Sequence, residues 1–215
     1  MQAIIYSHGF GVQKDDRGLF TDIAEALPSF EHVQFDYNQI NIEENTLTAA
    51  TLNQQAGLLS EQIRLARTKY ETVDLICHSQ GCLAAALANP RGVRSIIFLA
   101  PPDNTDIDQF ADLFRNRPNS TINFKAISKV TRRDGSTTII PAQYWSSLGS
   151  IDAMECYQAL AQMSKLTIIT AANDEILGET HFNIVPSKAI TLPANHDFTK
   201  NARTPVIRAV QAILQ

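Results

Sequence analysis

The sequence predicts an α/β fold in which helices cover both faces of a mostly parallel, six-stranded sheet. Short apolar runs rich in β-branched residues alternate along the chain with longer segments whose apolar residues recur at helical spacing. The apolar runs show little alternation with polar residues, which is typical of parallel strands that are buried on both faces. Short connections between the two kinds of segment agree with this architecture.

Six core strands are expected from these apolar runs. They cover residues 2–7, 32–37, 72–78, 93–100, 166–171 and 188–193. The helices expected between and after them cover residues 16–27, 46–68, 81–88 and about 204–214. Pro28 ends the first helix, because proline cannot continue a helical hydrogen-bond pattern.

Length and composition indicate a single folded domain over residues 1–215. Hydrophobic residues make up 44% and charged residues 19% of the chain, as in ordinary globular proteins. The net charge of −4 gives no indication of a nucleic-acid or membrane partner. The one basic pair with basic neighbours, Arg132-Arg133 near Lys125 and Lys129, is interpreted as a solvated surface.

A cytoplasmic location is expected. No apolar run approaches the ~20 residues of a membrane span, and the first strand begins at Gln2, which leaves no room for a signal peptide. Three cysteines form no pairing framework. Cys77, His78 and Cys82 are close in sequence, but a strand would point the first two to opposite sides, so no metal site is predicted.

The stretch from Leu75 to Gly81, Leu-Ile-Cys-His-Ser-Gln-Gly, joins a predicted strand to a predicted helix at Ser79. A serine in such a sharp turn projects its hydroxyl from the sheet, as in the nucleophile elbow Gly-x-Ser-x-Gly. Here Gly81 supplies the second glycine, and Cys77, also small, stands in place of the first. The alternative is that Ser79 is an ordinary N-cap residue of a helix.

Three further segments supply what a nucleophilic serine needs. His8-Gly9-Phe10-Gly11 follows the first strand and offers backbone N–H groups to an oxyanion. Asp174 follows the strand at 166–171, and His196 follows the last strand. The chain order serine, aspartate, histidine differs from the order in trypsin-like and subtilisin-like proteases. Glu175 and Asp197 compete with Asp174 for the acid position.

On these motifs the chain resembles the α/β-hydrolase superfamily from end to end, apart from about residues 103–163. The resemblance implies a six-stranded α/β-hydrolase fold with a small cap inserted after the fourth strand at residues 103–163. It favours Asp174 as the acid, with Ser79 as nucleophile and His196 as base. The N–H groups of Phe10 and Gln80 would form the oxyanion hole, and no metal or cofactor is implied.

The predicted cap contains a helix near residues 110–114, a hairpin around Asp134-Gly135, the pair Tyr144-Trp145 and a helix at 151–163. This order resembles the small cap of bacterial cinnamoyl and feruloyl esterases. Tyr144 or Trp145 is expected to line the substrate pocket, the alternative being that both rings anchor the cap. His78 is expected beneath the nucleophile or on the pocket floor.

The function expected is hydrolysis of a small-molecule carboxylic ester through an acyl-enzyme. A thioesterase, a small-amide hydrolase and a lactone hydrolase would use the same three residues and stay open as alternatives. The non-enzymatic alternative is a hydrolase fold retained for ligand binding, in which one or more of the three catalytic residues would be replaced.

Overall fold

The computed structural model describes residues 1–132, 134–185 and 187–215. Its main element is a six-stranded sheet in the order β10-β9-β6-β5-β1-β2, in which all neighbouring strands run parallel. The strands are β1 (Gln2–Ser7), β2 (Glu31–Val33), β5 (Thr72–His78), β6 (Ser95–Leu99), β9 (Lys165–Ala171) and β10 (Ser187–Leu192). This confirms the predicted sheet.

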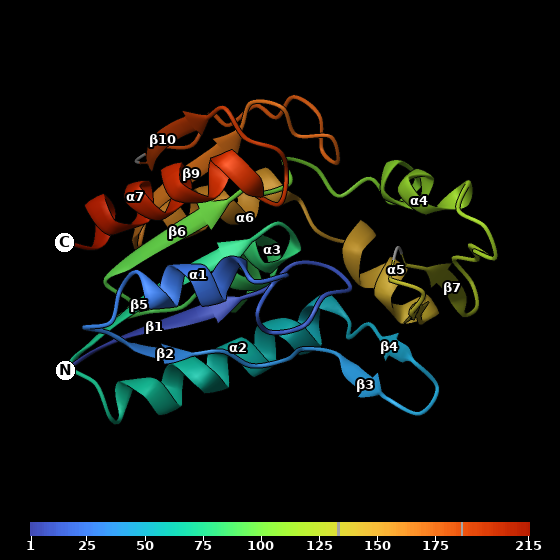
Figure 1. Ribbon diagram of the computed structural model, residues 1–215, viewed down its shortest axis with the longest axis horizontal. Helices are drawn as coiled ribbons and strands as arrows, with labels where there is room; N and C mark the ends of the chain where they lie inside the picture. The colour runs from blue at the N-terminus through green and yellow to red at the C-terminus, as the bar shows by residue number, and fades with distance from the viewer. Residues whose placement is uncertain (133, 186) are drawn as a thin grey trace.

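Helices cover both faces of this sheet, as predicted (Figure 1). One apolar core forms where α1 and α7 pack on one face, and a second, larger core forms where α2, α3 and α6 pack on the other. The helices are α1 (Leu19–Glu25), α2 (Leu52–Arg67), α3 (Gln80–Ala88), α6 (Ala153–Ala161) and α7 (Arg203–Leu214). A short 3-10 turn, Lys200–Ala202, precedes α7.

The second strand is shorter than expected and ends at Val33 instead of residue 37. The residues that follow do not continue the ladder with β1, and bond instead to its last residue and to the loop after it. The Tyr37 N–H donates to Nε2 of His8, and the Tyr37 hydroxyl lies 2.7 Å from Oγ of Ser7. The chain therefore leaves the sheet early and supports that loop.

A second, four-stranded sheet in the order β3-β4-β8-β7 was not predicted as such. Its strands are β3 (Gln39–Asn41), β4 (Thr46–Thr48), β7 (Ser128–Thr131) and β8 (Thr137–Ile140). The prediction of helix from residue 46 is wrong at its start, because the β-branched Thr46 and Thr48 pair with β8 in parallel. Helix α2 begins only after Thr51, whose side chain forms a capping box with Gln54.

The segment predicted as a cap contains α4 (Ile107–Arg115), the β7–β8 pair, α5 (Ala142–Gly149) and α6. The antiparallel pairing of β7 with β8 confirms the hairpin around Asp134-Gly135, where Gly135 adopts a φ of 83°. Helix α5 was not predicted, and Arg133 of the predicted turn lies outside the described residues. Figure 1 places α4 and α5 beside the carboxyl ends of the central strands, whereas α6 lies in the main body.

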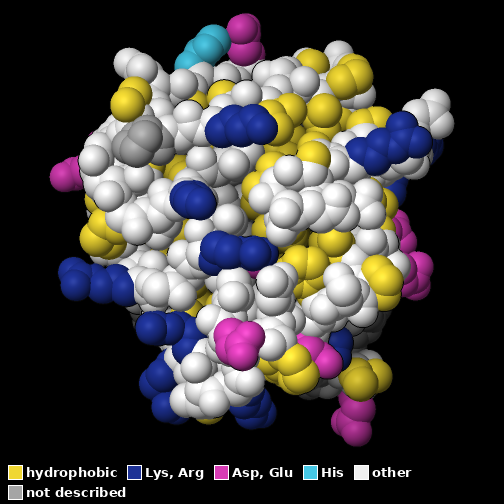
Figure 2. Space-filling view, turned by 90° about the vertical axis from the view of Figure 1, so that its left-hand side faces the viewer, with side chains coloured by type: hydrophobic (Ala, Val, Ile, Leu, Met, Phe, Trp, Pro, Cys, Tyr) yellow, Lys and Arg dark blue, Asp and Glu magenta, His cyan; other side chains and the backbone are white. Residues whose placement is uncertain are grey.

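The opposite end of the molecule carries the two chain termini (Figure 1). Figure 2 shows this face, where some lysine and arginine side chains are spread among uncharged, hydrophobic and acidic groups and others gather toward its lower left. Within the described part of the chain, no helix is both long enough and apolar enough to cross a membrane.

Candidate active site

Ser79 occupies a strained turn between β5 and α3. Its φ of 50° and ψ of −125° are rare for a residue with a side chain, and its N–H donates to the carbonyl of Leu99 at 2.9 Å. A Cβ atom at Gly81 would lie 2.1 Å from the carbonyl oxygen of Ser7. Only glycine fits there, which is the close approach that the elbow motif predicted.

The structure brings Ser79, His196 and Asp174 together in one hydrogen-bonded chain. Nε2 of His196 lies 2.9 Å from Oγ of Ser79, and Nδ1 of His196 lies 2.7 Å from Oδ2 of Asp174. With Nδ1–H donating to the carboxylate, Nε2 presents a lone pair to the hydroxyl of Ser79. The three residues follow β5, β10 and β9, at the carboxyl edge of one sheet.

The Asp174 carboxylate is held in its ionised form. Burial alone would raise its pKa, but the hydrogen bond and charge of His196 lower it, together with backbone donors. Those donors are the N–H groups of Ile176 and Leu177, at 2.9 and 2.8 Å from Oδ1. One oxygen is thus fixed by the backbone, and the other faces the imidazole.

The two competing carboxylates have other partners. Glu175 accepts a hydrogen bond from the backbone N–H of His196 at 3.0 Å, and Asp197 forms an ion pair with Arg17 at 2.5 Å. Neither carboxylate forms a hydrogen bond or ion pair with the imidazole of His196 among the described residues. The geometry therefore favours Asp174 over both alternatives.

The loop after β1 presents Phe10 next to the elbow. The Gly9 N–H is occupied by Asp16 at 2.8 Å, whereas the N–H groups of Phe10 and Gln80 donate to no acceptor within the described residues. Nδ1 of His8 donates to the Gly9 carbonyl at 2.9 Å, because Nε2 accepts from Tyr37. Burial lowers the pKa of His8, so this histidine is neutral and fixes the loop.

Directly beneath this loop lies a second, buried histidine–aspartate pair. Nδ1 of His78 lies 2.9 Å from Oδ2 of Asp16, and Nε2 of His78 donates to the backbone carbonyl of His196 at 3.1 Å. Burial would lower the pKa of His78, but the charge and hydrogen bond of Asp16 raise it. Burial would raise the pKa of Asp16, but the charge of His78 lowers it. We infer an ion pair that joins the Gly9 loop to the His196 loop.

Residues 30–159, more than half of the chain, match the family model described as "Serine hydrolase". The chain belongs to this family. It is therefore a hydrolase, and the match includes Ser79 but ends before Asp174 and His196. A comparison with curated protein sequences gives no significant match.

Several solved structures with the same fold are described as esterases or lipases. The esterase domain of a Rhodothermus marinus protein is 19% identical, with a TM-score of 0.64 over 99% of this chain and 85% of that one. Est1E from Butyrivibrio proteoclasticus with ferulic acid is 16% identical, with a TM-score of 0.68 over 100% and 88%. The monoacylglycerol lipase of Paleococcus ferrophilus is 14% identical, with a TM-score of 0.67 over 98% and 93%. These likenesses confirm the α/β-hydrolase fold of this serine hydrolase.

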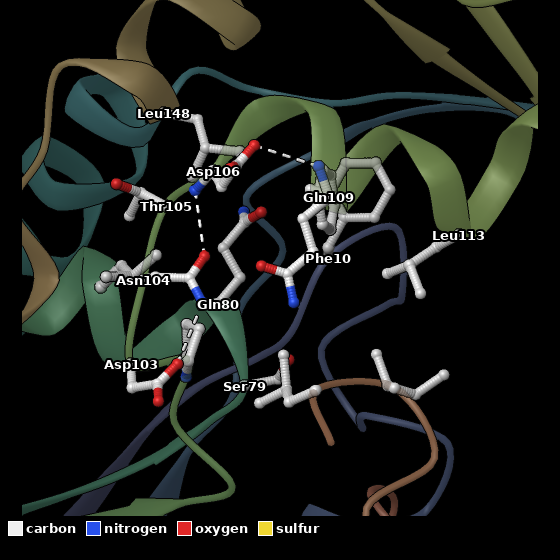
Figure 3. Close-up of a pocket in the computed structure, with 15 residues that line it drawn as sticks. Phe10, Ser79, Gln80, Asp103, Asn104, Thr105, Asp106, Gln109, Leu113 and Leu148 are labelled. Carbon is white, nitrogen blue, oxygen red and sulfur yellow. Dashed lines mark hydrogen bonds between the residues drawn. The ribbon is translucent and has the colours of Figure 1, made fainter. Parts of the chain in front are cut away.

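Two cavities of the serine hydrolase meet at Ser79. The smaller, of about 70 Å³, is lined by Gln80, the loop 103–106, α4 residues and Leu148 (Figure 3). The larger, of about 410 Å³, is lined by His196, by His78 and by side chains from the Gly9 loop, α4 and the β7–β8 turn. Phe10 borders both, so this side chain stands between them.

Tyr144 and Trp145 line neither cavity and are 0% and 1% exposed. The Tyr144 hydroxyl donates to the side-chain amide oxygen of Gln80, and Nε1 of Trp145 donates to Oγ of Ser128 at 3.1 Å. The expectation that one of these rings lines the pocket is corrected by this placement. Both rings are core residues of α5, as the anchor alternative proposed.

One group of metal-ligand atoms occurs among the described residues, on His78, His196 and Asp197, within 4.8 Å of one another. Each of these residues already has a partner, namely Asp16, the Ser79–Asp174 chain and Arg17. Cys77 and Cys82 are buried, and burial raises the pKa of both thiols. The donor set is therefore that of an ion-pair network, not that of a metal centre.

Sequence reasoning missed Asp16 and Arg132 as residues of the site. Asp16 lies 62 positions from His78, so no local pattern connects them. Arg132 was interpreted as a solvated residue, yet it lines the larger cavity beside the oxyanion loop. The sequence of a hairpin turn does not show whether a basic residue in it faces solvent or the active-site cavity.

Proposed function

We propose that this serine hydrolase cleaves carboxylic esters through an acyl-enzyme, with Ser79 as nucleophile, His196 as base and Asp174 as acid. The observation that carries the proposal is the unbroken hydrogen-bonded chain from Ser79 through His196 to Asp174. A fold retained only for ligand binding would have no need of this geometry.

In the first half-reaction, His196 takes the proton of Ser79 as Oγ attacks the ester carbonyl carbon. The imidazolium formed is stabilised by Asp174, whose pKa is lowered, so that it stays ionised at neutral pH. When the tetrahedral intermediate collapses, the carbon–oxygen bond to the alcohol breaks, and Nε2 of His196 returns the proton to the leaving oxygen.

In the second half-reaction, water takes the place of the alcohol. His196 removes a proton from this water as it attacks the acyl carbon, and the Ser79 oxygen leaves with the proton from His196. The products are one carboxylic acid and one alcohol per ester and water consumed, so no redox partner or cofactor takes part in the balance.

The negative charge that develops on the carbonyl oxygen is received by the N–H groups of Phe10 and Gln80 in this proposal. Their lack of acceptors within the described residues supports the assignment. The loss of one such donor typically costs about 3–4 kcal/mol of transition-state stabilisation. The Asp16 and His8 contacts hold the Phe10 loop in place before substrate binds.

We also propose that residues 1–215 form one α/β-hydrolase domain and that residues 103–163 act as its cap. The smaller cavity, which is bordered by Ser79 and Gln80, supports a place for the acyl group. One structure of Est1E holds ferulic acid.

The experiment that tests the function is covalent labelling by a fluorophosphonate probe, followed by a panel of activated esters, thioesters and amides. We expect a single labelled residue, Ser79, and esters as the preferred substrates. Ser79→Ala should abolish both labelling and turnover, because it removes the atom that forms the acyl-enzyme. Its circular dichroism spectrum should match that of the wild type.

Ser60→Ala is the matched control, since Ser60 lies on the exposed face of α2. This variant should label and turn over as the wild type does. Labelling of another residue in Ser79→Ala, or turnover that survives this change, would overturn the proposal. If thioesters are the preferred substrates, the proposed triad would stand and the protein would be a thioesterase instead of an esterase.

A further inference from the structure

The larger cavity beside His196 carries three arginines along its wall. Arg17 follows the oxyanion loop, Arg117 follows α4, and Arg132 lies in the turn between β7 and β8. They come from parts of the chain that are distant in sequence, and the fold gathers them at the mouth of one site. Arginine is the side chain best suited to carboxylate and phosphate groups, because its planar fork matches their oxygens.

Arg132 lies against the backbone of the oxyanion loop. Its Nη1 would lie 2.8 Å from a Cβ atom placed at Gly11, so the guanidinium rests on the backbone next to Phe10. Gly11 adopts a φ of 62°, and the absence of a side chain there leaves the room that the guanidinium fills. The positive charge is thereby held over the edge of the oxyanion loop.

The Arg132 side chain has no hydrogen bond or ion pair within residues 1–132, 134–185 and 187–215. The carboxylates that share the cavity all bond to groups other than Arg132. Asp16 bonds to His78, Glu175 to the N–H of His196, Asp197 to Arg17, and Asp134 to Ser136. The guanidinium is thus a half-buried donor of several hydrogen bonds that faces the cavity without an acceptor.

The surroundings of Arg132 favour a bound anion. Burial lowers its pKa to about 10, with further lowering by the charges of Arg17 and Arg117, and the nearby Asp134 and Asp197 do not cancel this effect. Arg117 lies over the Phe114 ring at 4.8 Å, and Arg17 is paired with Asp197. An anionic ligand would relieve the repulsion among these three cations.

The position of His196 shows which part of an ester would meet the arginines. Nε2 of His196 must reach the leaving oxygen to protonate it, and His196 lines only the larger of the two cavities. Gln80, the proposed oxyanion donor, lines only the smaller. The alcohol part of the ester therefore extends toward Arg132, and the acyl part occupies the smaller cavity.

On these observations the geometry points to a substrate class: esters whose alcohol carries a carboxylate or phosphate group, which Arg132 binds. This inference rests on the proposed esterase function and specifies its substrate. The arginines select the alcohol by charge.

The test uses three acetate esters that differ only at one end of the leaving group. They are 4-acetoxybenzoate, its neutral isostere 4-acetoxybenzamide, and 4-acetoxyphenyl phosphate. We compare kcat/KM for each ester between the wild type and Arg132→Gln. For each ester, kcat/KM of the wild type is divided by that of Arg132→Gln, so the intrinsic reactivity of the leaving group cancels. The resulting factors are then compared between the charged and the neutral esters. The carboxylate and phosphate esters show which of the two anions is preferred.

Arg132→Gln should lower kcat/KM for the anionic esters by about tenfold to a hundredfold, mainly through KM, as expected when one hydrogen bond to a charged group is lost. The neutral amide should change by less than about twofold. Arg132→Lys should retain part of the preference, because it keeps the charge and loses the fork. Arg208→Gln, on the exposed face of α7, is the control and should resemble the wild type.

A measurement on the wild type alone guards against a variant that does not fold. 4-Hydroxybenzoate should inhibit at a concentration at least tenfold below that of 4-hydroxybenzamide, and added salt should reduce this difference. Equal inhibition by the two products, or an equal loss for charged and neutral esters in Arg132→Gln, would overturn the inference. If the inference fails in this way but turnover of the neutral ester is lost in Ser79→Ala, the proposed esterase function still holds. Turnover that survives Ser79→Ala would contradict both the esterase function and the inferred substrate class.

Discussion

His196 is held from four sides by groups of different kinds. Ser79 and Asp174 bond to its ring, Glu175 accepts its backbone N–H, and His78 donates to its backbone carbonyl. A ring that is fixed at its backbone loses little entropy when the substrate arrives. The precise direction of Nε2 is therefore set before catalysis begins.

Asp174→Asn should lower kcat by about 10³–10⁴-fold with little change in KM. The amide can present its N–H₂ to Nδ1, which favours the wrong imidazole tautomer and leaves substrate contacts intact. Steady-state kinetics on an activated ester, with burst amplitude from a stopped-flow record, measures the effect.

Asp197→Asn is the comparison for this prediction. It weakens the ion pair with Arg17 and does not touch the imidazole, so its loss in kcat should be below about tenfold. If Asp197→Asn proves more damaging than Asp174→Asn, the acid has been placed on the wrong loop.

At the level of single residues, the sequence predicted well where a motif is local. Ser79 and Gly81 are two positions apart, and the elbow motif predicts both the strained turn at Ser79 and the close backbone approach at Gly81. Asp174 could be separated from Glu175 and Asp197 only by the resemblance, because each of the three could reach His196 along the chain. The hydrogen bond of 2.7 Å between Nδ1 of His196 and Oδ2 of Asp174 supports Asp174, through geometry that no spacing encodes.

At the level of elements, the junction of β5 and α3 tolerates only glycine at position 81. Gly81→Ala would bring its Cβ within 2.1 Å of the Ser7 carbonyl oxygen, and relief would require β1 and α3 to separate. We expect a lowered urea midpoint and a loss of at least about a hundredfold in kcat/KM, because the elbow and the oxyanion loop would move together.

Gly57→Ala in α2 is the matched change for this test. A Cβ there meets nothing within 4 Å, so alanine should stabilise the protein by about 0.5–1 kcal/mol and leave kcat/KM unchanged. Urea unfolding and esterase assays on both variants decide the matter. Wild-type stability and activity in Gly81→Ala would contradict the close-packing argument.

Regular elements were predictable where they pack on the central sheet, since burial on both faces leaves a clear pattern. Strands β3 and β4 escaped prediction because each has only three residues, and because β4 pairs with β8, about ninety positions away along the chain. The expectation for Tyr144 and Trp145 failed for another reason. Both rings are buried in α5, and the sequence alone does not separate a ring that contacts a ligand from one that anchors a helix.

For the molecule as a whole, the buried pair of His78 and Asp16 should make stability depend on pH. The raised pKa of His78 means that its contribution is complete below its unfolded pKa of about 6.5 and is lost as pH rises through the folded value. The lowered pKa of Asp16 means that its contribution is complete above about 3.9 and is lost as pH falls through the folded value. The pair therefore stabilises the folded state most between about pH 3.9 and pH 6.5.

His78→Gln should therefore cost about 3–5 kcal/mol near pH 6, because Asp16 is left as a buried charge without its cation. The cost should shrink at alkaline pH, where the wild type also loses the cation. Urea unfolding of both proteins between pH 5 and pH 9 measures the difference. Asp16→Asn serves as the second variant, and it should remove the alkaline decline in stability. A difference that stays constant from pH 5 to pH 9 would contradict the ion pair.

The parallel pairing of β4 with β8 has a consequence for protein engineering. Residues 46–48 lie outside the proposed cap, yet they form hydrogen bonds with residues 137–139 inside it. A chimera that receives only residues 103–163 from a relative would leave the edge of β4 without its neighbour and expose it to intermolecular strand pairing. A chimera designed to change substrate specificity should therefore take residues 39–48 and residues 103–163 from the same relative.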